Sequence, residues 1–371
     1  MPLVHWTENE PLSAHWHSES SLPPPRRLIV ADDRMRAATA YRHACEGTAL
    51  LWRDDYHGAR QLLAALSRRI NRKAPDPVPT ASATFHAQRR FRAHRSRVLA
   101  RLLVLLEPDH TLALRRAPDV RQACTEAYGP PAGPTLVPLR ELLGALGAHQ
   151  WREKGVIVPA LGAARIHPHY GVFAPVRGEY VDLVAEAPLP TTPTTAFDLG
   201  TGTGVLAAVL ARRGVRRVIA TDLSPRACAC ARDNVSRLGL ADRVTVTGPE
   251  LYPPGRAALV VCNPPWLPAR PASTLDQGVY DPGGAMLHAF LAGLPAHLEP
   301  GGEGWLILSD LAEHLGLRTR TELLGAIEQA GLKLLSRTNT RPRHPRATDP
   351  SDPLHTARAA EVTSLWRLAV R

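Results

Sequence analysis

Residues 197–204 read Phe-Asp-Leu-Gly-Thr-Gly-Thr-Gly, and this stretch decides the fold. A β-branched run precedes it and an apolar, helix-like run follows, so we expect a strand, a glycine turn and a helix in that order. Gly200, Gly202 and Gly204 let the backbone turn tightly and approach a ligand with no Cβ in the way. The spacing is not that of the dinucleotide loop, and no Lys follows to hold a phosphate. Beside the alternative of a plain glycine turn, the stretch predicts a ligand-binding loop preceded by an acid, Asp198.

A second acid, Asp222, ends the next strand-like run, Val218 to Asp222. A carboxylate at that place can accept hydrogen bonds from both ribose hydroxyls of a bound nucleoside. Ser224 and Pro225 follow it, so a simple helix start is the alternative. Together with the glycine turn, Asp222 indicates a nucleoside-containing ligand.

Strand-like and helix-like runs alternate from residue 195 to the end of the chain. This alternation predicts an α/β fold with a parallel sheet covered by helices on both faces. The Pro- and Arg-rich segment 339–360 offers no helix between the last two strands, so we expect that pair to be antiparallel. The expected strands are 195–199, 216–221, 243–247, 257–262, 304–309, 332–338 and 363–370, and the expected helices are 204–213, 225–238, 284–298 and 318–330.

A proline turn, Asn263-Pro264-Pro265-Trp266, follows the strand at 257–262. Two prolines cannot continue a sheet, so the chain turns at the carboxyl end of that strand, where open α/β sheets bind ligands. The Asn263 side chain and the Pro264 carbonyl can together accept both protons of an –NH₂ group, and Trp266 offers a flat face for a planar group. The turn predicts a site for a planar amide or an exocyclic base amine, against the alternative of a structural turn with a packed Trp.

The N-terminal region has a different character. Residues 1–34 lack periodicity and predict a loosely ordered arm, whereas apolar residues at helical spacing predict a helical domain over 35–150. Two β-rich runs on either side of Gly162 predict a β-hairpin within 155–174. We therefore expect a linker and lid segment over 151–190, followed by the main α/β domain over 191–371.

Composition narrows the class of protein. The 371 residues carry a net charge of +11, and no apolar run reaches the length of a membrane helix. The start of the chain does not resemble a signal peptide, and the 5 Cys show neither secreted-scaffold density nor zinc spacing. These features predict a cytoplasmic protein with no metal site. The positive charge raises the question of a nucleic-acid partner, particularly for the arginines at 89–101, whose alternative is a solvated helix face.

With both motifs in place, residues 165–371 resemble class I S-adenosylmethionine-dependent methyltransferases. The Asn-Pro-Pro-Trp turn places the resemblance in the group of methyltransferase small domains, similar to HemK-like glutamine and adenine N-methyltransferases. The stretch Pro175 to Glu179 and the segment Asp281-Pro282-Gly283-Gly284 also match that group. The resemblance implies a seven-stranded, mostly parallel Rossmann-like sheet, with an N-terminal helical domain joined through a β-hairpin.

The resemblance also implies roles for individual residues, with S-adenosyl-L-methionine as the cofactor. Glu250 stands one residue later than the family's adenine-contacting acid, and Trp266 stands where the glutamine enzymes usually have Tyr. The residues implied in catalysis are Asn263, Pro264, Pro265 and Trp266; those implied in cofactor binding are Asp198, Gly200, Gly202, Gly204, Asp222, Glu250, Asn263 and Glu179.

The methyl acceptor stays open between two classes. The resemblance implies a protein glutamine amide, whereas the Trp266 ring and the basic N-terminal region favour an exocyclic amine of adenine or guanine in RNA or DNA. Small-molecule acceptors and an inactive cofactor-binding scaffold are further alternatives. Either main reading implies a macromolecular partner, protein or RNA, including a ribosome-associated one, and no membrane partner. Target choice is expected in the N-terminal domain and in the loop 267–283.

Overall fold

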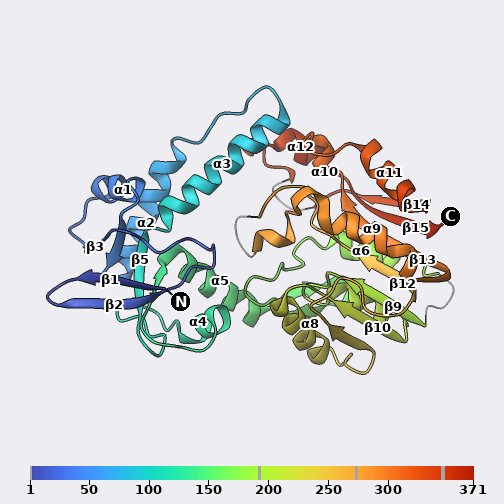
Figure 1. Ribbon diagram of the computed structural model, residues 1–371, viewed down its shortest axis with the longest axis horizontal. Coiled ribbons are helices and arrows are strands. Elements are labelled where there is room, and N and C mark those ends of the chain that lie inside the picture. Colours follow the sequence, from blue (N-terminus) through green and yellow to red (C-terminus); the bar gives the residue numbers. More distant parts are fainter. Residues whose placement is uncertain (1, 191–193, 272–274, 344–346) are drawn as a thin grey trace. The chain divides into compact units, whose positions relative to one another are not determined.

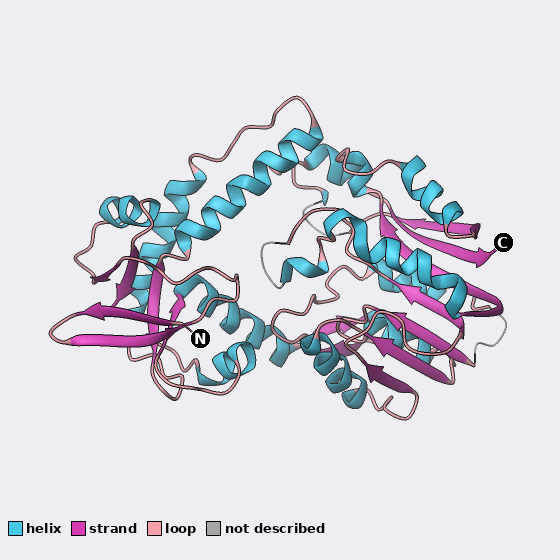
Figure 2. Ribbon diagram, in the orientation of Figure 1, coloured by secondary structure: helices cyan, strands magenta, loops and turns pink. Residues whose placement is uncertain are grey.

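The computed structural model describes residues 2–190, 194–271, 275–343 and 347–371 (Figures 1 and 2). Part of the loop 267–283 lies outside these residues. The chain divides into two compact units. The N-terminal unit comprises residues 1–76 and 85–150, and the C-terminal unit comprises residues 77–84 and 151–371. Both contain a sheet and helices, and each is described by itself.

In the described residues, the C-terminal unit has a seven-stranded sheet whose strand order is β11-β10-β9-β12-β13-β15-β14. The strands from β11 to β13 are parallel, whereas β15 is antiparallel to both of its neighbours. The predicted seven strands and the antiparallel last strand are confirmed. The expectation of no helix between the last two strands is wrong, because α12 (His355–Ala360) lies between β14 and β15 in the chain. The bounds are β9 (Thr195–Leu199), β10 (Arg217–Thr221), β11 (Val244–Thr247), β12 (Ala257–Cys262), β13 (Leu298–Ser309), β14 (Leu332–Thr340) and β15 (Thr363–Val370).

The strand order reverses between β9 and β12. The chain proceeds from β9 through β10 to β11 on one side, then returns to the other side of β9 with β12 and β13. Open α/β sheets bind ligands at such a switch point, outside the carboxyl ends of the strands. The glycine turn follows β9 and the proline turn follows β12, so this topology brings the two motifs to neighbouring strand ends.

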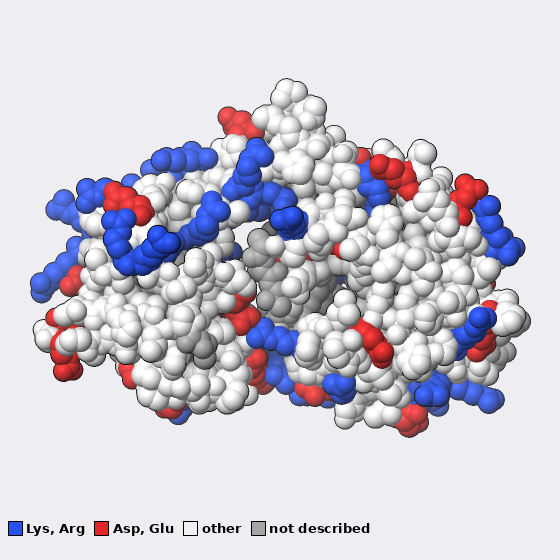
Figure 3. All heavy atoms as spheres, in the orientation of Figure 1, with Lys and Arg blue, Asp and Glu red and all other residues white. Residues whose placement is uncertain are grey.

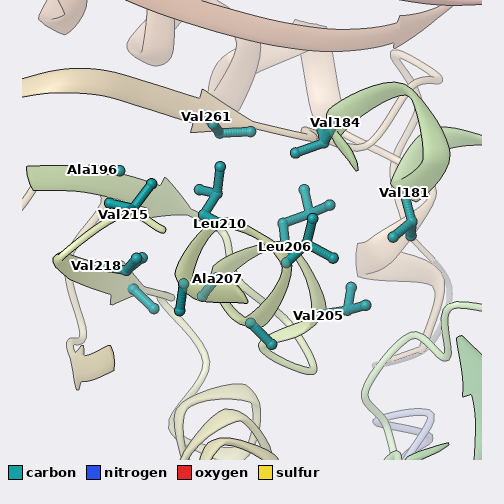
Figure 4. Packing of buried hydrophobic residues seen from close by; sticks show 14 of the residues in the cluster. Val181, Val184, Ala196, Val205, Leu206, Ala207, Leu210, Val215, Val218 and Val261 are labelled. Atoms are coloured by element: carbon teal, nitrogen blue, oxygen red, sulfur yellow. The ribbon is translucent and has the colours of Figure 1, made fainter. Parts of the chain in front are cut away.

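Helices cover both faces of this sheet. Alternate residues of a strand accordingly pack into two different hydrophobic clusters, one on each face. Ala196 packs into one cluster and Phe197 into the other. Figure 4 shows part of the first cluster, with Leu210 directed toward Ala196 and Val261. The helices are α6 (Glu179–Glu186), α7 (Val205–Arg212), α8 (Pro225–Arg237), α9 (Ala285–His297), α10 (Leu311–His314), α11 (Arg320–Gln329) and α12 (His355–Ala360).

The N-terminal unit contains a sheet that the sequence did not reveal. In the described residues it is six-stranded, with the order β1-β2-β6-β5-β4-β3. The expectations of a loosely ordered arm over 1–34 and of a helical domain over 35–150 are therefore wrong. The strands are β1 (Leu3–Thr7), β2 (Pro11–Trp16), β3 (Leu28–Ala31), β4 (Ala49–Trp52), β5 (Leu102–Leu106) and β6 (Thr135–Pro138).

The strands β4 and β5 are short and mostly buried, which explains why residues 35–150 were predicted to be helical. All four residues of β4 are buried, and β5 is apolar throughout, so neither strand shows the alternation that marks a half-buried strand. In β5, Val104 packs on one side of the sheet and Leu103 on the other. Helices adjoin these runs: α1 (Ala37–Cys45), α2 (Tyr56–Asn71), α3 (Ala81–Leu99), α4 (Arg121–Tyr128) and α5 (Leu139–Lys154).

A short hairpin begins the C-terminal unit. Strands β7 (Val156–Val158) and β8 (Ala164–Ile166) pair antiparallel across a 3₁₀ turn at Pro159–Leu161, so the hairpin predicted within 155–174 is confirmed. Residues 167–174 continue from it without a strand. Two further 3₁₀ turns, Leu275–Gly278 and Pro282–Gly284, precede α9. Across the ranges that the structure describes, no helix is long and apolar enough to span a bilayer.

Candidate functional site

The glycine turn has a backbone that only glycine adopts readily. Gly200, Gly202 and Gly204 have φ values of 69°, 57° and 80°, in the left-handed region. A Cβ on Gly204 would lie 3.2 Å from the Ala231 Cα, so this glycine lets α7 approach α8 closely. A Cβ on Gly202 would meet nothing within 4 Å, because that position faces open space. The predicted glycines therefore have separate roles in packing and in ligand approach.

Asp198 lies beneath the turn rather than in the cavity. Its Oδ2 accepts hydrogen bonds from the Thr201 hydroxyl (2.6 Å) and from the Ala207 backbone N–H (3.0 Å). The residue is 1% exposed, and this burial raises the pKa of Asp198 to about 6. Asp198 thus joins the start of α7 to the turn, and it shapes the loop without lining the cavity.

Asp222 connects the glycine turn with the start of α8. Its carboxylate accepts the Gly202 N–H at 3.0 Å and the Ser224 N–H at 2.8 Å. Burial raises the pKa of Asp222, while these backbone donors oppose the shift. Each carboxylate oxygen has a second lone pair, so Asp222 can still accept hydroxyl donors from a ligand. Ser224 also caps α8, so the helix-start reading and the ligand reading of this segment hold together.

A cavity of about 690 Å³ opens at the switch point. Six of the predicted residues line it: Gly200, Gly202, Asp222, Glu250, Asn263 and Pro265. Backbone N–H groups and carboxylates therefore meet an amide side chain around one space. The predicted residues Asp198, Gly204, Glu179, Pro264 and Trp266 are absent from the lining.

Apolar residues that the sequence reasoning missed complete the wall. Leu223 is 63% exposed although it is a large aliphatic residue, and it borders the cavity directly after Asp222. Phe173 contributes from the segment that follows the hairpin, and Leu251 follows Glu250. Such side chains suit the faces of a planar base. Only their places beside predicted polar residues could have indicated them from the sequence.

Asp281 belongs to the Asp-Pro-Gly-Gly segment and was not predicted as a site residue. It is 5% exposed, borders the cavity and accepts the Met286 N–H at 2.9 Å, so it caps the start of α9. Met286 also borders the cavity, and its side chain fills the space beside Gly200 where a Cβ would stand. The Asp-Pro-Gly-Gly segment therefore positions α9 against the glycine turn.

The proline turn holds its own asparagine in one orientation. The Trp266 indole N–H donates to Asn263 Oδ1 at 2.9 Å, which fixes the direction of the side-chain amide. An amide oxygen has two lone pairs, so one remains for a donor in the cavity. Trp266 itself is partly buried and packs against both hydrophobic clusters of the sheet.

A half-buried arginine packs against the Trp266 ring. The Arg177 guanidinium lies 4.8 Å from the centre of the Trp266 ring, a cation–π distance. Arg177 Nε donates to Glu179 at 2.9 Å and Nη2 donates to Glu361 at 3.0 Å. Glu361 Oε1 also accepts the Ser309 hydroxyl at 2.7 Å. Glu179, implied as a cofactor contact, instead accepts a hydrogen bond from the arginine that packs against the proline turn.

Across the described ranges, no group of three or more His, Cys, Asp or Glu side chains could hold a metal ion. The polar groups around the cavity include backbone N–H groups, carboxylates, hydroxyls and the side-chain amides of Asn263 and Gln277. Such a set can bind a nucleoside and orient a planar nitrogen.

Comparison with known proteins finds similarity in the segment that contains most of the site residues. Residues 164–330 match the family model described as methyltransferase small domain, which confirms the predicted resemblance over that segment. The release factor glutamine methyltransferase of Cereibacter sphaeroides is 37% identical over 165 residues, covering 41% of this chain and 57% of that protein. The ribosomal protein L11 methyltransferase of Pelotomaculum thermopropionicum is 48% identical over 71 residues, covering 19% of this chain and 23% of that protein.

Coverage of these relatives is partial. The chain spans about half the length of the release factor relatives, since the one from Moorella thermoacetica is matched over 48% of its length at 37% identity. Among solved structures, a methyltransferase from Pyrococcus furiosus aligns with a TM-score of 0.41 and 18% identity, covering 61% of this chain and 98% of that one. The ribosomal protein L11 methylase of Lactobacillus delbrueckii aligns with a TM-score of 0.38 and 18% identity, covering 56% and 86%. The fold assignment rests on the strand order given above.

Proposed function

Because residues 164–330 match the methyltransferase small domain family, we propose that the chain is an S-adenosylmethionine-dependent N-methyltransferase. The observation that carries this proposal is the convergence of two motifs on one cavity. Gly202 and Asp222 border it from the β9 and β10 ends, and Asn263 borders it from the end of β12. A nucleoside-binding loop and a hydrogen-bond acceptor for an amide or amine thus share one space.

The cavity residues fit S-adenosylmethionine, which supplies an electrophilic methyl group when bound. Asp222 would accept hydrogen bonds from the ribose hydroxyls, and Glu250 has the position for a contact with the adenine. Leu223 and Leu251 offer apolar surface for the faces of the base. Gly202 leaves room for close approach of the ligand, and Asp198 holds the loop in shape.

Asn263 and the Pro264 carbonyl are the acceptor-binding groups in this proposal. Asn263 Oδ1 keeps one free lone pair and the Pro264 carbonyl is held by a stiff turn, so together they can accept both protons of an –NH₂ group. This fixes the plane of the nitrogen, which is catalysis by positioning and electrostatic complementarity. The nitrogen can release its proton to water after transfer, so no protein base is required.

A protein glutamine amide is the leading acceptor. The support is that relatives carrying the matching segment are named for a release factor glutamine and for ribosomal protein L11. Both names denote components of translation, so we propose an acceptor from the translation machinery and a cytoplasmic location. We propose that the N-terminal unit and the described part of the loop 267–283 select this acceptor. Residues 151–190 are proposed to act as a linker and lid.

The second candidate acceptor is an exocyclic amine of adenine or guanine in RNA or DNA. It is favoured by the size of the Trp266 ring and by the density of arginine in the N-terminal unit. An inactive cofactor-binding scaffold is the remaining alternative, and the geometry of Asn263 argues against it because its free lone pair borders the cavity.

The deciding experiment uses cofactor with a labelled methyl group and a cell extract treated with ribonuclease or protease. Label that only protease removes supports a protein acceptor, whereas label that only ribonuclease removes would refute it. Asn263→Ala should abolish transfer and leave the cofactor dissociation constant within about twofold. Asn339→Ala, on the edge strand β14, is the matched control and should transfer normally. Full activity of Asn263→Ala would refute the proposed mechanism.

A further inference from the structure

Three neighbouring helices of the chain contain no acidic residue. Helices α1, α2 and α3 together hold many arginines and no Asp or Glu. Surface helices normally alternate both signs, because opposite charges three or four residues apart stabilise a helix and like charges destabilise it. A helical surface of one sign therefore indicates selection for something other than stability.

Five arginines on or next to α2 and α3 are exposed. Arg68, Arg69 and Arg72 on or directly after α2, with Arg90 and Arg97 on α3, are all exposed. Within the ranges that the structure describes, none of them forms an ion pair or a side-chain hydrogen bond. We call these five residues the basic helical surface. Figure 3 shows Lys and Arg side chains gathered over the α1–α3 part of the N-terminal unit.

The two helices that carry this surface are fixed to each other. Arg95 of α3 donates to Asn71 at 3.0 Å and to Ser67 at 2.7 Å, both on α2. Spacings of four residues on α2 and seven residues on α3 keep each pair, Arg68 with Arg72 and Arg90 with Arg97, on one side of its helix. The positive charges are therefore carried by two helices that are hydrogen-bonded to each other.

Acidic residues do accompany arginines elsewhere in the same unit. Arg53 pairs with Glu8 at 2.6 Å, Arg116 with Asp55 at 2.7 Å and Arg121 with Asp119 at 2.6 Å. Helices α1–α3 differ from these segments because they contain no acid at all.

We propose that the basic helical surface binds the phosphate backbone of an RNA. Guanidinium groups match phosphate oxygens with paired hydrogen bonds, and a patch with no acid repels no phosphate. The choice of RNA among polyanions rests on the proposed function, in which the acceptor belongs to the translation machinery. RNA binding is a step of target selection, separate from the cavity in the C-terminal unit.

Fluorescence anisotropy with a short labelled RNA hairpin tests this proposal on the full chain. Replacing the five arginines together by Gln should weaken binding roughly 100-fold and lower the slope of log affinity against log salt by about 3.5. The matched control replaces Arg216, Arg217 and Arg237, exposed arginines of the C-terminal unit, and should change the affinity less than threefold. Thermal unfolding of the five-residue variant should be unchanged, which separates lost binding from misfolding.

Each alternative outcome is distinguishable. An equal loss in both variants would show a general charge effect and overturn the proposal. An equal or tighter affinity for a DNA hairpin of the same sequence would overturn the choice of RNA, and tighter binding of polyglutamate would assign the surface to an acidic protein. Binding of the hairpin needs no cofactor, so a chain that binds RNA but not S-adenosylmethionine would refute the proposed function and leave this surface standing.

Discussion

The two units are both α/β structures, yet only one could be read from the sequence. In the C-terminal unit strands and helices alternate along the chain, and glycine or proline separates many of them. In the N-terminal unit, the strands β4, β5 and β6 have four or five residues, are mostly buried on both faces and adjoin helices almost directly. A short apolar run of this kind shows no alternation of polar and apolar residues, so its sequence cannot be distinguished from that of the adjoining helix.

The units also differ in how they use a buried aspartate at a helix start. Asp198 faces only neutral donors, and burial raises its pKa to about 6. Asp55 caps α2 and accepts a hydrogen bond from Arg116, which holds the pKa of Asp55 well below its usual range. The C-terminal unit thus carries an aspartate, Asp198, whose ionisation is unfavourable because it is buried. In the N-terminal unit, the arginine beside Asp55 favours the ionised carboxylate.

The largest expected effect concerns the glycine turn. Gly202→Val should weaken S-adenosylmethionine binding by about 1000-fold, on the order of 4 kcal/mol, because the new side chain would occupy the cavity. Isothermal titration calorimetry measures the dissociation constant of S-adenosylmethionine. Gly239→Val is the control, since Gly239 also has a left-handed φ with open space around its Cβ but does not line the cavity. Equal loss in both variants would show that backbone strain, not the cavity, is responsible.

The next effect tests the unexpected sheet of the N-terminal unit. Leu103→Ala in β5 should lower the free energy of unfolding by about 3 kcal/mol, because Leu103 is fully buried in its strand. Chemical denaturation measures the change. Leu335→Ala on the exposed edge strand β14 should cost less than about 0.5 kcal/mol. A small cost at Leu103 would contradict the burial of β5 and restore the helical reading of this unit.

The two aspartates should give opposite pH dependence. The pKa of Asp198 is raised in the folded state, so its contribution is greatest at low pH and is lost as the pH rises from about 4 to 6, on the order of 3 kcal/mol. The contribution of Asp55, whose pKa is lowered, is present at neutral pH and is lost as the pH falls below 3.8. The free energy of unfolding is measured at several pH values. Asp198→Asn should remove the fall in stability between about pH 4 and 6, and Asp55→Asn should remove the loss of stability at low pH. Slopes of the same sign would refute the contrast.

The smallest effect concerns the arginine that supports Trp266. Arg177→Gln should lower kcat roughly 10- to 30-fold, about 2 kcal/mol, with little change in cofactor affinity, because the Trp266 ring and Asn263 lose their fixed orientation. Glu361→Gln, which keeps the shape of the buried pair, should show a weaker loss of the same kind. Arg177→Lys should restore part of kcat. A change in KM alone would assign Arg177 to acceptor binding instead.

Much of the site was visible in the sequence because its motifs are contiguous. Gly200, Gly202, Asp222, Glu250 and Asn263 were all predicted, and all border the cavity. The supporting roles were not visible, since they depend on contacts between distant segments. Glu361 stands 184 positions after Arg177 in the chain, and nothing in its local sequence indicates that contact.

By itself, the sequence determined the seven-stranded sheet, the family resemblance and the polar residues around the cavity. Local pattern sufficed there, because strand ends of a parallel sheet gather at one edge and each motif lies directly after a strand. Only the tertiary structure decided that the N-terminal unit has a sheet and that Asp198 and Glu179 lie outside the cavity. It alone also showed that the five arginines of the basic helical surface have no ion pair among the described residues. These features depend on burial and pairing between remote residues, which a one-dimensional pattern does not record.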